Sequence, residues 1–418
     1  MNDNHSRHEF IYKPRWLQSF FEACLPIHPI IVLTGARQTG KSTFLQYSEP
    51  VCNWRYITLD NFDIRHQAEI NPSALWAGAD AIVIDEVQNS PLLLSAVKMA
   101  VDDKKRRVRF VLSGSANLLL MRRVSETLAG RAVYLRLYPM TLGEIRGRSV
   151  PSIVSELFSG ELPPDGKVEK EENDPFAQIS KGFMPSLMSL DRSDAVTMWW
   201  EGYVATYLER DLRALSQIES LADFRRVMEM LALRSGQMLN QTEISRDAGI
   251  SQSTVHRYIN LIETSCLAER LPAFHVNRTK RLIKAPKFYW LDSGLAAFLA
   301  GFHDLASVRS AREAGALFET FILQHLRVLS DLLIPKARVY YWRTVNGKEV
   351  DFVIEHGRKL LAVEVKLTSV PLYADIEGLK LFMEEYPETS CGLLVYNGNE
   401  IRRMDERIVA VPWSVLTG

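Results

Sequence analysis

The sequence lacks paired cysteines, net charge and long apolar runs, and each absence excludes a class of protein. Its four cysteines, Cys24, Cys52, Cys266 and Cys391, lie far apart, which argues against a disulfide framework or a zinc site and for a reducing compartment. The 50 lysines and arginines balance 50 aspartates and glutamates, so any nucleic-acid binding needs a local basic patch. No apolar run reaches transmembrane length, and the polar start MNDNHSRHEF lacks the apolar region of a signal peptide. We therefore expect a cytoplasmic protein without a membrane partner.

Short apolar runs alternate with helical stretches in the first part of the chain. The runs are apolar on both faces, as in a parallel sheet covered by helices, and they occupy residues 30–35, 55–60, 81–86 and 108–114. The acidic, proline-containing stretch 161–175 predicts an exposed loop. A helical middle over about 194–236, a compact helical module over 224–292 and a mixed α/β segment follow. A chain of 418 residues is long enough for two or three domains, so we expect a multidomain α/β protein.

The stretch GARQTGKST, Gly35–Thr43, fits the phosphate-loop pattern between an apolar strand and a helix start. Its glycines let backbone N–H groups face an anion at the positive end of the following helix. Lys41 is expected to reach the β- and γ-phosphates of ATP, and the Ser42 hydroxyl is expected to ligate Mg²⁺. A chance glycine-rich turn is the alternative, against which the flanking strand and helix argue. The predicted nucleotide site comprises Gly35, Ala36, Arg37, Gln38, Thr39, Gly40, Lys41, Ser42 and Thr43.

The stretch AIVIDEVQ predicts the partner of the phosphate loop. Asp85 ends an apolar strand, where a carboxylate holds the Mg²⁺ shell, and Glu86 is placed to act as the general base. The alternative is an acidic pair solvated at the sheet edge. Ser113 and Ser115 follow another strand and would contact the γ-phosphate or its water, although a plain Ser/Gly turn explains them equally well.

Hydrolysis of ATP usually needs one more positive charge on the transition state. The candidates are Arg122, Arg123 and Arg131, of which we favour Arg131 in SETLAGRA. An arginine that acts on a neighbouring subunit's nucleotide would require a homo-oligomer. A solvated or ion-paired surface arginine is the alternative for each.

Residues 239–271 have the rhythm of a helix-turn-helix. Thr242 is expected to cap a first helix, Gly249 to form the turn and Ser251 to cap the second helix. The side expected to be buried holds Ile244, Ala248, Ile250, Val255, Ile259 and Ile262. The outward side near the second helix's start holds residues that reach phosphates and base edges: Gln252, Ser253, Thr254, His256 and Arg257.

The stretch NRTKRLIKAPK follows this module and contains no acid. It would place a wing or strand against a phosphate backbone, which favours DNA as the partner. The alternative is a module that packs against protein. Its basic residues are Arg278, Lys280, Arg281, Lys284 and Lys287.

The stretch KEVDFVIEHGRKLLAVEVK, Lys348–Lys366, predicts two strands joined at a two-residue Gly-Arg turn. In that hairpin His356 pairs with Lys359, and the same register places Asp351 opposite Glu364. Like charges so placed are destabilising, and a divalent cation between them would reverse the sign of the interaction. The hairpin therefore predicts a metal site.

Lys366, on the same face as Glu364, would orient a water or stabilise developing negative charge. With Mg²⁺ or Mn²⁺, the two acids and this lysine suit metal-assisted phosphodiester hydrolysis. Glu319, among apolar neighbours in GALFETFILQHL, would complete the metal shell. The alternatives are an exposed salt-bridge ladder with Lys366, Lys348 or Arg343, and an inactive domain that keeps the shape.

Nearly the whole chain resembles the prokaryotic AAA-type ATPases that carry a C-terminal domain of the DUF4143 kind. Two motifs, GARQTGKST and AIVIDEVQ, are shared by many P-loop proteins. The more specific ones are VLSGSANLL with SETLAGRAVYLRLYPMTLGEI, NRTKRLIKAPKFYWLDSGLA, and GALFETFILQHL with VYYWRTVNGKEVDFVI and LAVEVK.

The resemblance implies an AAA+ core, a winged helix and a restriction-endonuclease-like (PD-(D/E)xK) fold. We place the ATPase domain at 1–195, the helical linker and winged helix at 196–300 and the nuclease-like domain at 301–418. The resemblance implies that the phosphate loop binds ATP, that Asp85 and Glu86 serve Mg²⁺ and hydrolysis, and that Arg131 lies in the family's LAGRA element. Onto the nuclease motif it maps Glu319, Asp351, Glu364 and Lys366. Val350 stands where the wider pattern has a proline, and that proline is often absent.

These features predict a Mg²⁺-dependent ATPase that engages DNA, branched or single-stranded, and whose C-terminal domain would cleave DNA with a metal. The alternative is a nucleotide-gated oligomeric switch or scaffold, whose inactive nuclease-like domain dimerises or binds a protein. A small-molecule kinase would leave the helical module and the second acidic site without a role.

Overall fold

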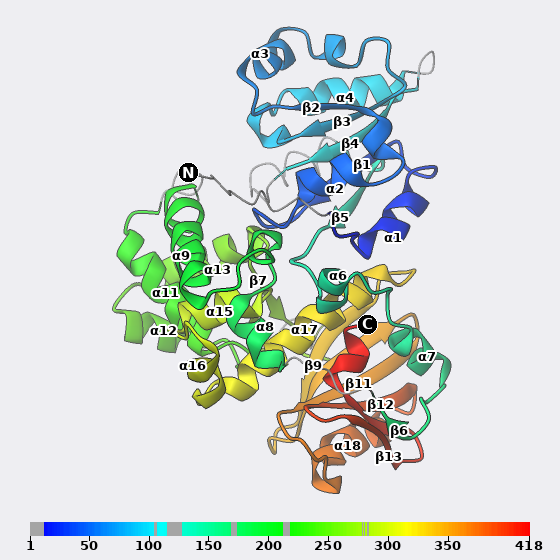
Figure 1. The fold of residues 1–418 in the computed structure, drawn as a ribbon, viewed down its shortest axis with the longest axis vertical. Helices are drawn as coiled ribbons and strands as arrows, with labels where there is room; N and C mark the ends of the chain where they lie inside the picture. Colours follow the sequence, from blue (N-terminus) through cyan, green and yellow to red (C-terminus); the bar gives the residue numbers. More distant parts are fainter. Residues whose placement is uncertain are drawn as a thin grey trace, which may run out of the picture. The chain divides into compact units, whose positions relative to one another are not determined.

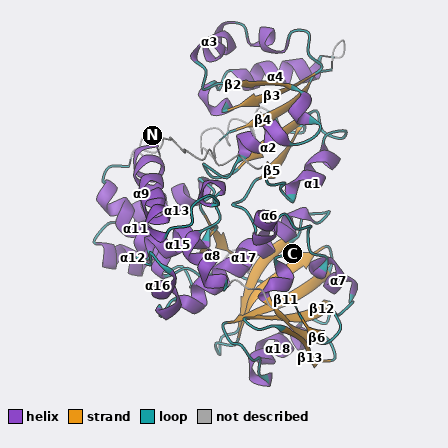
Figure 2. Cartoon of the chain, in the orientation of Figure 1, coloured by secondary structure: helices purple, strands orange, loops and turns teal. Residues whose placement is uncertain are grey.

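The computed structural model describes residues 12–103, 107–114, 128–168, 174–211, 218–277, 279, 281 and 284–418 (Figures 1 and 2). The chain divides into two compact units, and each is described by itself. Unit 1 is Met1–Met140 with Met184–Asp191, and unit 2 is Thr141–Phe183 with Arg192–Gly418. Among the residues described, no helix is both long and apolar enough to cross a membrane.

Unit 1 is built on a parallel five-stranded sheet in the order β2-β3-β4-β1-β5. The four strands expected from the sequence are confirmed as β1 (Ile30–Thr34), β2 (Arg55–Thr58), β3 (Ala81–Asp85) and β4 (Arg109–Ser113). The fifth, β5 (Ala132–Arg136), was not expected, because its residues are half-buried rather than fully apolar on both faces. The helices are α1 (Leu17–Cys24), α2 (Lys41–Tyr47), α3 (Phe62–Ile70) and α4 (Leu93–Asp102), with 3-10 turns η1 (Val51–Asn53), η2 (Pro72–Trp76), η3 (Val87–Asn89) and η4 (Pro185–Leu187).

Both faces of this sheet are covered, as continuous apolar strands require. Alternate residues of β1, β3 and β4 form one core with α3, η2 and α4, as Ile30, Ile82 and Phe110 illustrate. The intervening residues face the other side, where α1 and α2 lie and where Phe21 packs edge-on against Phe44 at 5.3 Å between ring centroids (Figure 1). The loops that follow the strands therefore meet at one carboxyl edge, where ligands bind in such sheets.

Unit 2 contains a helical part and a large sheet. The helical part holds α6 (Leu142–Arg146), α7 (Ile153–Ser159), α8 (Pro175–Lys181), α9 (Ser193–Tyr203), the π-helical η5 (Val204–Asp211), α11 (Leu221–Leu233), α12 (Gln241–Ala248), α13 (Gln252–Thr264), α15 (Ser293–Leu299), α16 (Leu305–Ser310) and α17 (Ala314–Leu332). Antiparallel strands β7 (Ala268–Leu271) and β8 (Lys287–Trp290) follow α13.

The large sheet has seven strands in the order β6-β13-β14-β12-β11-β10-β9, and α18 (Glu377–Glu385) packs on one of its faces. Its strands are β6 (Gly166–Lys167), β9 (Arg338–Arg343), β10 (Glu349–His356), β11 (Lys359–Lys366), β12 (Thr389–Tyr396), β13 (Glu400–Asp405) and β14 (Ile408–Pro412), with 3-10 turns η6 (Tyr373–Ile376) and η7 (Trp413–Leu416). Parallel pairing of β11, β12 and β14 makes the sheet mixed.

The division into two units differs from the predicted boundaries at residues 195 and 300. Segment 141–183 belongs to unit 2, where α7 contacts β11 and β12, β6 pairs with β13, and α8 contacts α15, α16 and α17. Residues 184–191 belong to unit 1. The sequence of a short amphipathic helix does not indicate which hydrophobic core it packs against. The sequence pattern therefore could not assign these segments to one unit or the other.

The turn between α12 and α13 agrees with the predicted helix-turn-helix geometry in most respects. Gly249 ends α12 with φ 68°, and Ser251 accepts a hydrogen bond from the Thr254 N–H at 3.2 Å. Thr242 does not cap α12; the side chain of Asn240 does, because the helix begins at Gln241. Five of the six residues expected inside are buried, and Ile250 is half-buried.

Candidate functional sites

The phosphate loop connects β1 to α2 as the sequence predicted. Gly40 precedes α2 with φ 88°, a left-handed conformation that favours glycine. At Gly35, a Cβ atom would lie 2.3 Å from the Leu137 carbonyl oxygen, so no side chain fits there. The Lys41 ammonium is buried and donates to the carbonyl oxygens of Ala36 at 2.8 Å and Gly35 at 3.2 Å. The lysine is thus held inside the loop that would surround a phosphate.

Asp85 lies at the carboxyl end of β3 and is 2% exposed. Its carboxylate accepts hydrogen bonds from the Tyr56 hydroxyl at 2.6 Å, from the Glu86 N–H at 2.9 Å and from the Ser113 hydroxyl. Burial and the charge of Asp85 raise the pKa of Tyr56, which keeps that hydroxyl a proton donor. Ser113 therefore positions Asp85, while Ser115 lies outside the described residues. Tyr56 was missed because a tyrosine in a strand has no motif that separates it from the core.

Glu86 follows Asp85 in a left-handed conformation, with φ 55°. Such a conformation costs energy for a residue other than glycine and is often found at functional sites. Its carboxylate accepts a hydrogen bond from the Gln88 side-chain amide. Burial raises the pKa of Glu86, which brings this carboxyl closer to the range of a general base.

Of these residues, Gly40, Lys41, Glu86 and Gln88 line a cavity of about 1040 Å³ within unit 1. Six residues of the predicted nucleotide site contribute to its wall, together with Glu86; the six are Arg37, Gln38, Gly40, Lys41, Ser42 and Thr43. Gln38 also accepts a hydrogen bond from the Ser186 hydroxyl at 3.3 Å. Sequence reasoning missed the rest of the wall because it comes from distant segments without a local pattern: Tyr12, Lys13, Arg15, Asp60, Gln88, Asn89, Met140, Pro185, Ser186, Met188, Ser189 and Asp191.

Arg131 lies at the end of the sheet opposite the phosphate loop. It precedes β5, whose first residue Ala132 pairs with Ile30 at the start of β1, whereas the phosphate loop follows β1. A five-residue strand spans about 16 Å, so Arg131 cannot reach a nucleotide bound in its own chain. Its guanidinium pairs with Asp102 at 2.6 Å, and both side chains are partly exposed. Arg122 and Arg123 lie outside the described residues.

The C-terminal hairpin has the predicted register. His356 pairs with Lys359 and Phe352 with Val363, across a turn in which Gly357 has φ 64°. The ladder stops short of the predicted pair of Asp351 and Glu364. The Asp351 carboxylate instead accepts a hydrogen bond from the Val365 N–H at 2.8 Å.

A β-bulge places Asp351 where it is. Pairing between β10 and β9 shifts between Val350 and Val353, so Asp351 and Phe352 together oppose Tyr341. Val350 and Val353 consequently pack in the same core although they are three residues apart. Bulges re-aim side chains, and this one takes Asp351 out of the regular alternation.

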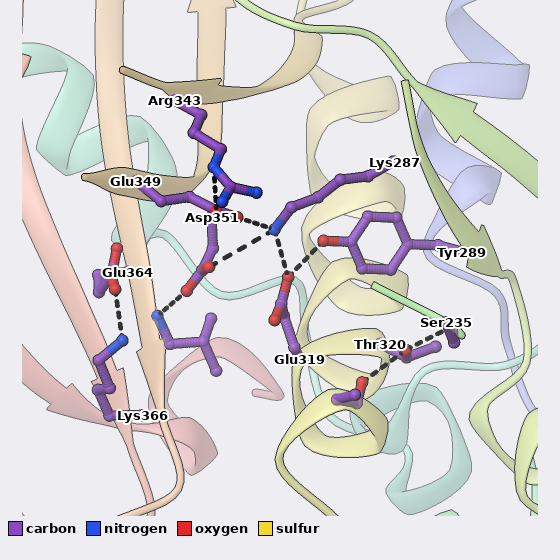
Figure 3. A network of polar contacts seen from close by, with 12 residues as sticks. Ser235, Lys287, Tyr289, Glu319, Thr320, Arg343, Glu349, Asp351, Glu364 and Lys366 are labelled. Atoms are coloured by element: carbon purple, nitrogen blue, oxygen red, sulfur yellow. Dashed lines mark hydrogen bonds and ion pairs between the residues drawn. The ribbon is translucent and has the colours of Figure 1, made fainter. Parts of the chain in front are cut away.

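Lys287 lies among three carboxylates next to this bulge (Figure 3). Its ammonium is 3.3 Å from Glu319 of α17 and 3.8 Å from Asp351, and it also pairs with Glu349 of β10. We call Glu319, Glu349, Asp351 and Glu364 the acidic centre. Burial alone would lower the pKa of Lys287, but the charges of Glu319, Asp351 and Glu349 outweigh it and raise that pKa, so the ammonium stays charged.

The remaining acids of this centre have other partners. Glu364 pairs with Lys366 at 2.5 Å, as expected for residues that share a strand face, and Glu319 accepts a hydrogen bond from the Tyr289 hydroxyl. Burial and the charge of Asp351 raise the pKa values of both Glu319 and Glu364. Asp351 and Glu364 are 8% and 7% exposed, so they do not form an exposed ladder, although Glu364 pairs with Lys366 as that alternative expected. Within the described ranges, no three His, Cys, Asp or Glu side chains are arranged to hold a metal ion.

The basic stretch before β8 does not present the surface that was expected. Lys287 is buried in the acidic centre, and Arg281 is buried in a pair with Glu355, stacked over Phe274 at 4.5 Å from the ring centroid. Lys284 is exposed. Arg278 and Lys280 lie outside the described residues. Two of the five basic residues expected on a surface are therefore buried, because Arg281 pairs with an acid of β10 and Lys287 with acids of β10 and α17.

Three family models match separate parts of the chain. Residues 27–146 match an AAA domain, residues 174–306 a domain of unknown function (DUF8612) and residues 314–416 a domain of unknown function (DUF4143). Residues 27–146 thus match an AAA domain and residues 314–416 match a DUF4143 domain, which confirms the resemblance predicted from the motifs. The matched descriptions name neither a winged helix nor a nuclease, and those two assignments stay predictions.

Relatives align over most of the chain. Uncharacterized proteins of Mycobacterium bovis and Mycobacterium tuberculosis are each 28% identical over 392 residues, which is 92% of this chain and 80% of the relative. An uncharacterized protein of Haemophilus influenzae is 21% identical over 412 residues, which is 92% of this chain and 94% of that protein.

Solved structures share only a distant likeness. A Walker-type ATPase of Pyrococcus abyssi is 14% identical, covers 69% of this chain and 96% of its own, and has a TM-score of 0.43. A signal transduction ATPase with numerous domains (STAND) from Pyrococcus horikoshii is 10% identical, covers 77% of this chain and 47% of its own, and has a TM-score of 0.21. Neither likeness carries an argument about function here.

Proposed function

We propose that this chain is a Mg²⁺-dependent ATPase whose nucleotide state controls its engagement with DNA. The observation that carries the ATPase part is the cavity of unit 1, whose wall includes the phosphate loop and Glu86. Lys41 would bind the β- and γ-phosphates, and Ser42 with Asp85 would hold Mg²⁺. Hydrogen bonds from Tyr56 and Ser113 fix the Asp85 carboxylate in place. Glu86, in the same cavity, would accept the proton of the attacking water.

An arginine from a second subunit would complete this site. Arg131 is at the far end of its own sheet from the phosphate loop, so it would act only on a neighbouring chain's nucleotide. Its pair with Asp102 is partly exposed, and such pairs are weak and easily exchanged. A homo-oligomer is therefore part of this proposal.

The segment 184–191 provides a route from nucleotide to unit 2. It lines the cavity in unit 1, while the residues just before it are fixed in unit 2. The Phe183 N–H donates to the buried Asp292 at 3.1 Å, and the Lys181 carbonyl accepts from Trp200 at 3.1 Å. A movement of segment 184–191 when ATP is hydrolysed would thus be transmitted through Lys181 and Phe183 to α8, α9 and α15.

DNA engagement is assigned to α13. Its first turns present exposed polar side chains, Gln252, Ser253, His256 and Arg257, while Val255 and Ile259 face the core. Three helices followed by the β7–β8 pair have the element order of a winged helix, in which the second helix of the turn enters the major groove. Because Arg281 and Lys287 are buried and do not belong to a basic surface, α13 would make the principal contact with DNA.

A nucleotide-gated switch or scaffold is the second candidate. It is favoured by Lys287, whose ammonium lies among the carboxylates that would otherwise bind a catalytic metal. In this alternative the C-terminal domain binds a protein or a second copy and does not cleave DNA.

DNA binding measured by fluorescence anisotropy separates these two functions. Arg257→Glu on α13 is expected to weaken binding to duplex, forked or single-stranded DNA by about 10-fold or more, because it replaces an attraction to phosphate by a repulsion. Arg402→Glu on β13 makes the same charge change away from α13 and should leave binding unaltered. If wild type binds no nucleic acid and its rate of ATP hydrolysis does not change when DNA is added, the switch or scaffold function is supported instead.

A further inference from the structure

The Lys287 ammonium points toward the carboxylates of Glu319, Glu349 and Asp351, and Arg343 and Tyr289 lie nearby (Figure 3). An ammonium has three donor hydrogens, and three carboxylates from two elements surround it: Glu319 of α17, and Glu349 and Asp351 of β10. Only 5% of the lysine side chain is exposed. A buried charge is tolerated when it is paired in this way, and here each acid also gains a counter-charge.

The backbone of Lys287 is fixed on both sides. β8 pairs with β7, where Lys287 stands opposite Leu271, and Lys287 also bridges to Met238 on its other side. The neighbouring Phe288 exchanges backbone hydrogen bonds with Gly236 and Gln237, at 2.8 and 3.0 Å. These contacts fix the backbone from which the ammonium extends, and every residue of β8 is buried.

We propose that the Lys287 ammonium is the resident cation of the acidic centre and that it excludes divalent metal ions from it. A Mg²⁺ or Mn²⁺ ion coordinates carboxylate oxygens at about 2.0–2.2 Å. An ion bound to Glu319 and Asp351 would share with Lys287 the oxygens that already lie 3.3 and 3.8 Å from the ammonium. Two cations that close repel each other strongly in a buried site.

The charges of the centre indicate what would follow if the ammonium were removed. Its four carboxylates are then left with Lys366, which pairs with Glu364, and the half-exposed Arg343, which lies 3.7 Å from Glu349. The second carboxylate oxygen of Glu364 is buried and has no hydrogen-bond partner among the described residues. Hard oxygen ligands with excess negative charge are what Mg²⁺ and Mn²⁺ select. A variant without the ammonium should therefore gain a metal site that wild type lacks.

The lysine gives unit 2 a metal-free centre that joins three elements. It ties β8, which follows the helix-turn-helix, to α17 and β10, so the centre serves cohesion rather than hydrolysis in wild type. This inference goes beyond the proposed function and does not depend on ATP hydrolysis or DNA binding.

Mn²⁺ titration of the full chain without nucleotide, read by the loss of the free-ion signal in electron paramagnetic resonance, tests this proposal. Lys287→Met, which keeps the apolar stem and removes the charge, should bind one more Mn²⁺ than wild type, and wild type should show no Asp351-dependent binding. Adding Asp351→Asn should abolish the gain. Lys287→Arg, the matched control that keeps a cation, should gain none.

Two results would overturn the proposal. The first is wild type that binds Mn²⁺ and loses it on Asp351→Asn, a comparison that leaves Lys287 in place and so does not depend on how its variants fold. The second is Lys287→Met that keeps the circular dichroism and melting transition of wild type yet gains no Mn²⁺. If Lys287→Met melts at a lower temperature than wild type, Mn²⁺ should restore its melting temperature, and it should not do so in the double variant with Asp351→Asn. Such a recovery supports the proposal, and the lack of any recovery overturns it.

Discussion

The buried carboxyl of Asp292 should make unit 2 less stable as pH rises through the weakly acidic range. Asp292 caps α15 by accepting from the N–H groups of Gly294 at 2.8 Å and Leu295 at 3.3 Å, and its other oxygen accepts from Phe183. Burial raises its pKa from 3.8 to about 6, although these hydrogen bonds work in the other direction. Between those two pH values the native state retains a proton that the unfolded chain has released.

The size of this change in unfolding free energy follows from the shift in the pKa of Asp292. A pKa raised by about two units corresponds to about 3 kcal/mol of unfolding free energy, present below pH 4 and lost above pH 6. About 2 kcal/mol of that loss should fall between pH 4.5 and pH 7.5. Asp292→Asn cannot titrate, so the stability of wild type relative to this variant should decline by that amount as pH rises.

Urea unfolding of both proteins at several pH values measures this difference. The comparison is needed because the buried His325, whose pKa burial lowers to about 4, changes stability with the opposite sign in the same pH range. His325 is present in both proteins, so its effect cancels in the difference. A difference that stays constant with pH, or grows in favour of wild type as pH rises, would contradict a raised pKa of Asp292 in the native state.

Two other substitutions test the packing and the nucleotide site. Gly294→Ala would place a Cβ 2.2 Å from the Gly182 Cα and should destabilise unit 2 by about 2 kcal/mol or more in thermal melts, whereas Gly315→Ala on α17, where nothing lies within 4 Å, should be neutral or stabilising. Equal effects of the two would contradict this packing. Gln88→Leu removes the donor that lowers the pKa of Glu86, so the acidic limb of the ATPase pH profile should move to higher pH; an unmoved limb with reduced kcat would mean that Gln88 does not act through Glu86.

The ATPase part of the fold could be predicted because its signals are local. A phosphate loop needs glycine at fixed positions and a lysine and serine beside them, and parallel strands buried on both faces are continuously apolar. The same holds for Asp85, which a strand end places at the carboxyl edge. The half-buried β5 and the cavity wall from 184–191 have no such local signal, since their positions depend on which core each segment joins.

The acidic centre shows why register alone did not suffice. Strand alternation predicted Asp351 opposite Glu364, but a β-bulge at Asp351 and Phe352 interrupts the alternation. The residue types at these two positions do not indicate a bulge. Lys287 was assigned to a surface because its neighbours in sequence are basic. Its partners lie 32 or more positions away on α17 and β10, and a pairing at that separation is decided by tertiary packing.

The most direct test of the account is steady-state ATP turnover by wild type, Lys41→Ala and Asp85→Asn, with Mg²⁺ and with EDTA. We predict Mg²⁺-dependent hydrolysis by wild type that falls about 100-fold or more in both variants, because one loses the phosphate contact and the other the metal ligand. Turnover that survives both substitutions, or that proceeds equally well in EDTA, would contradict it.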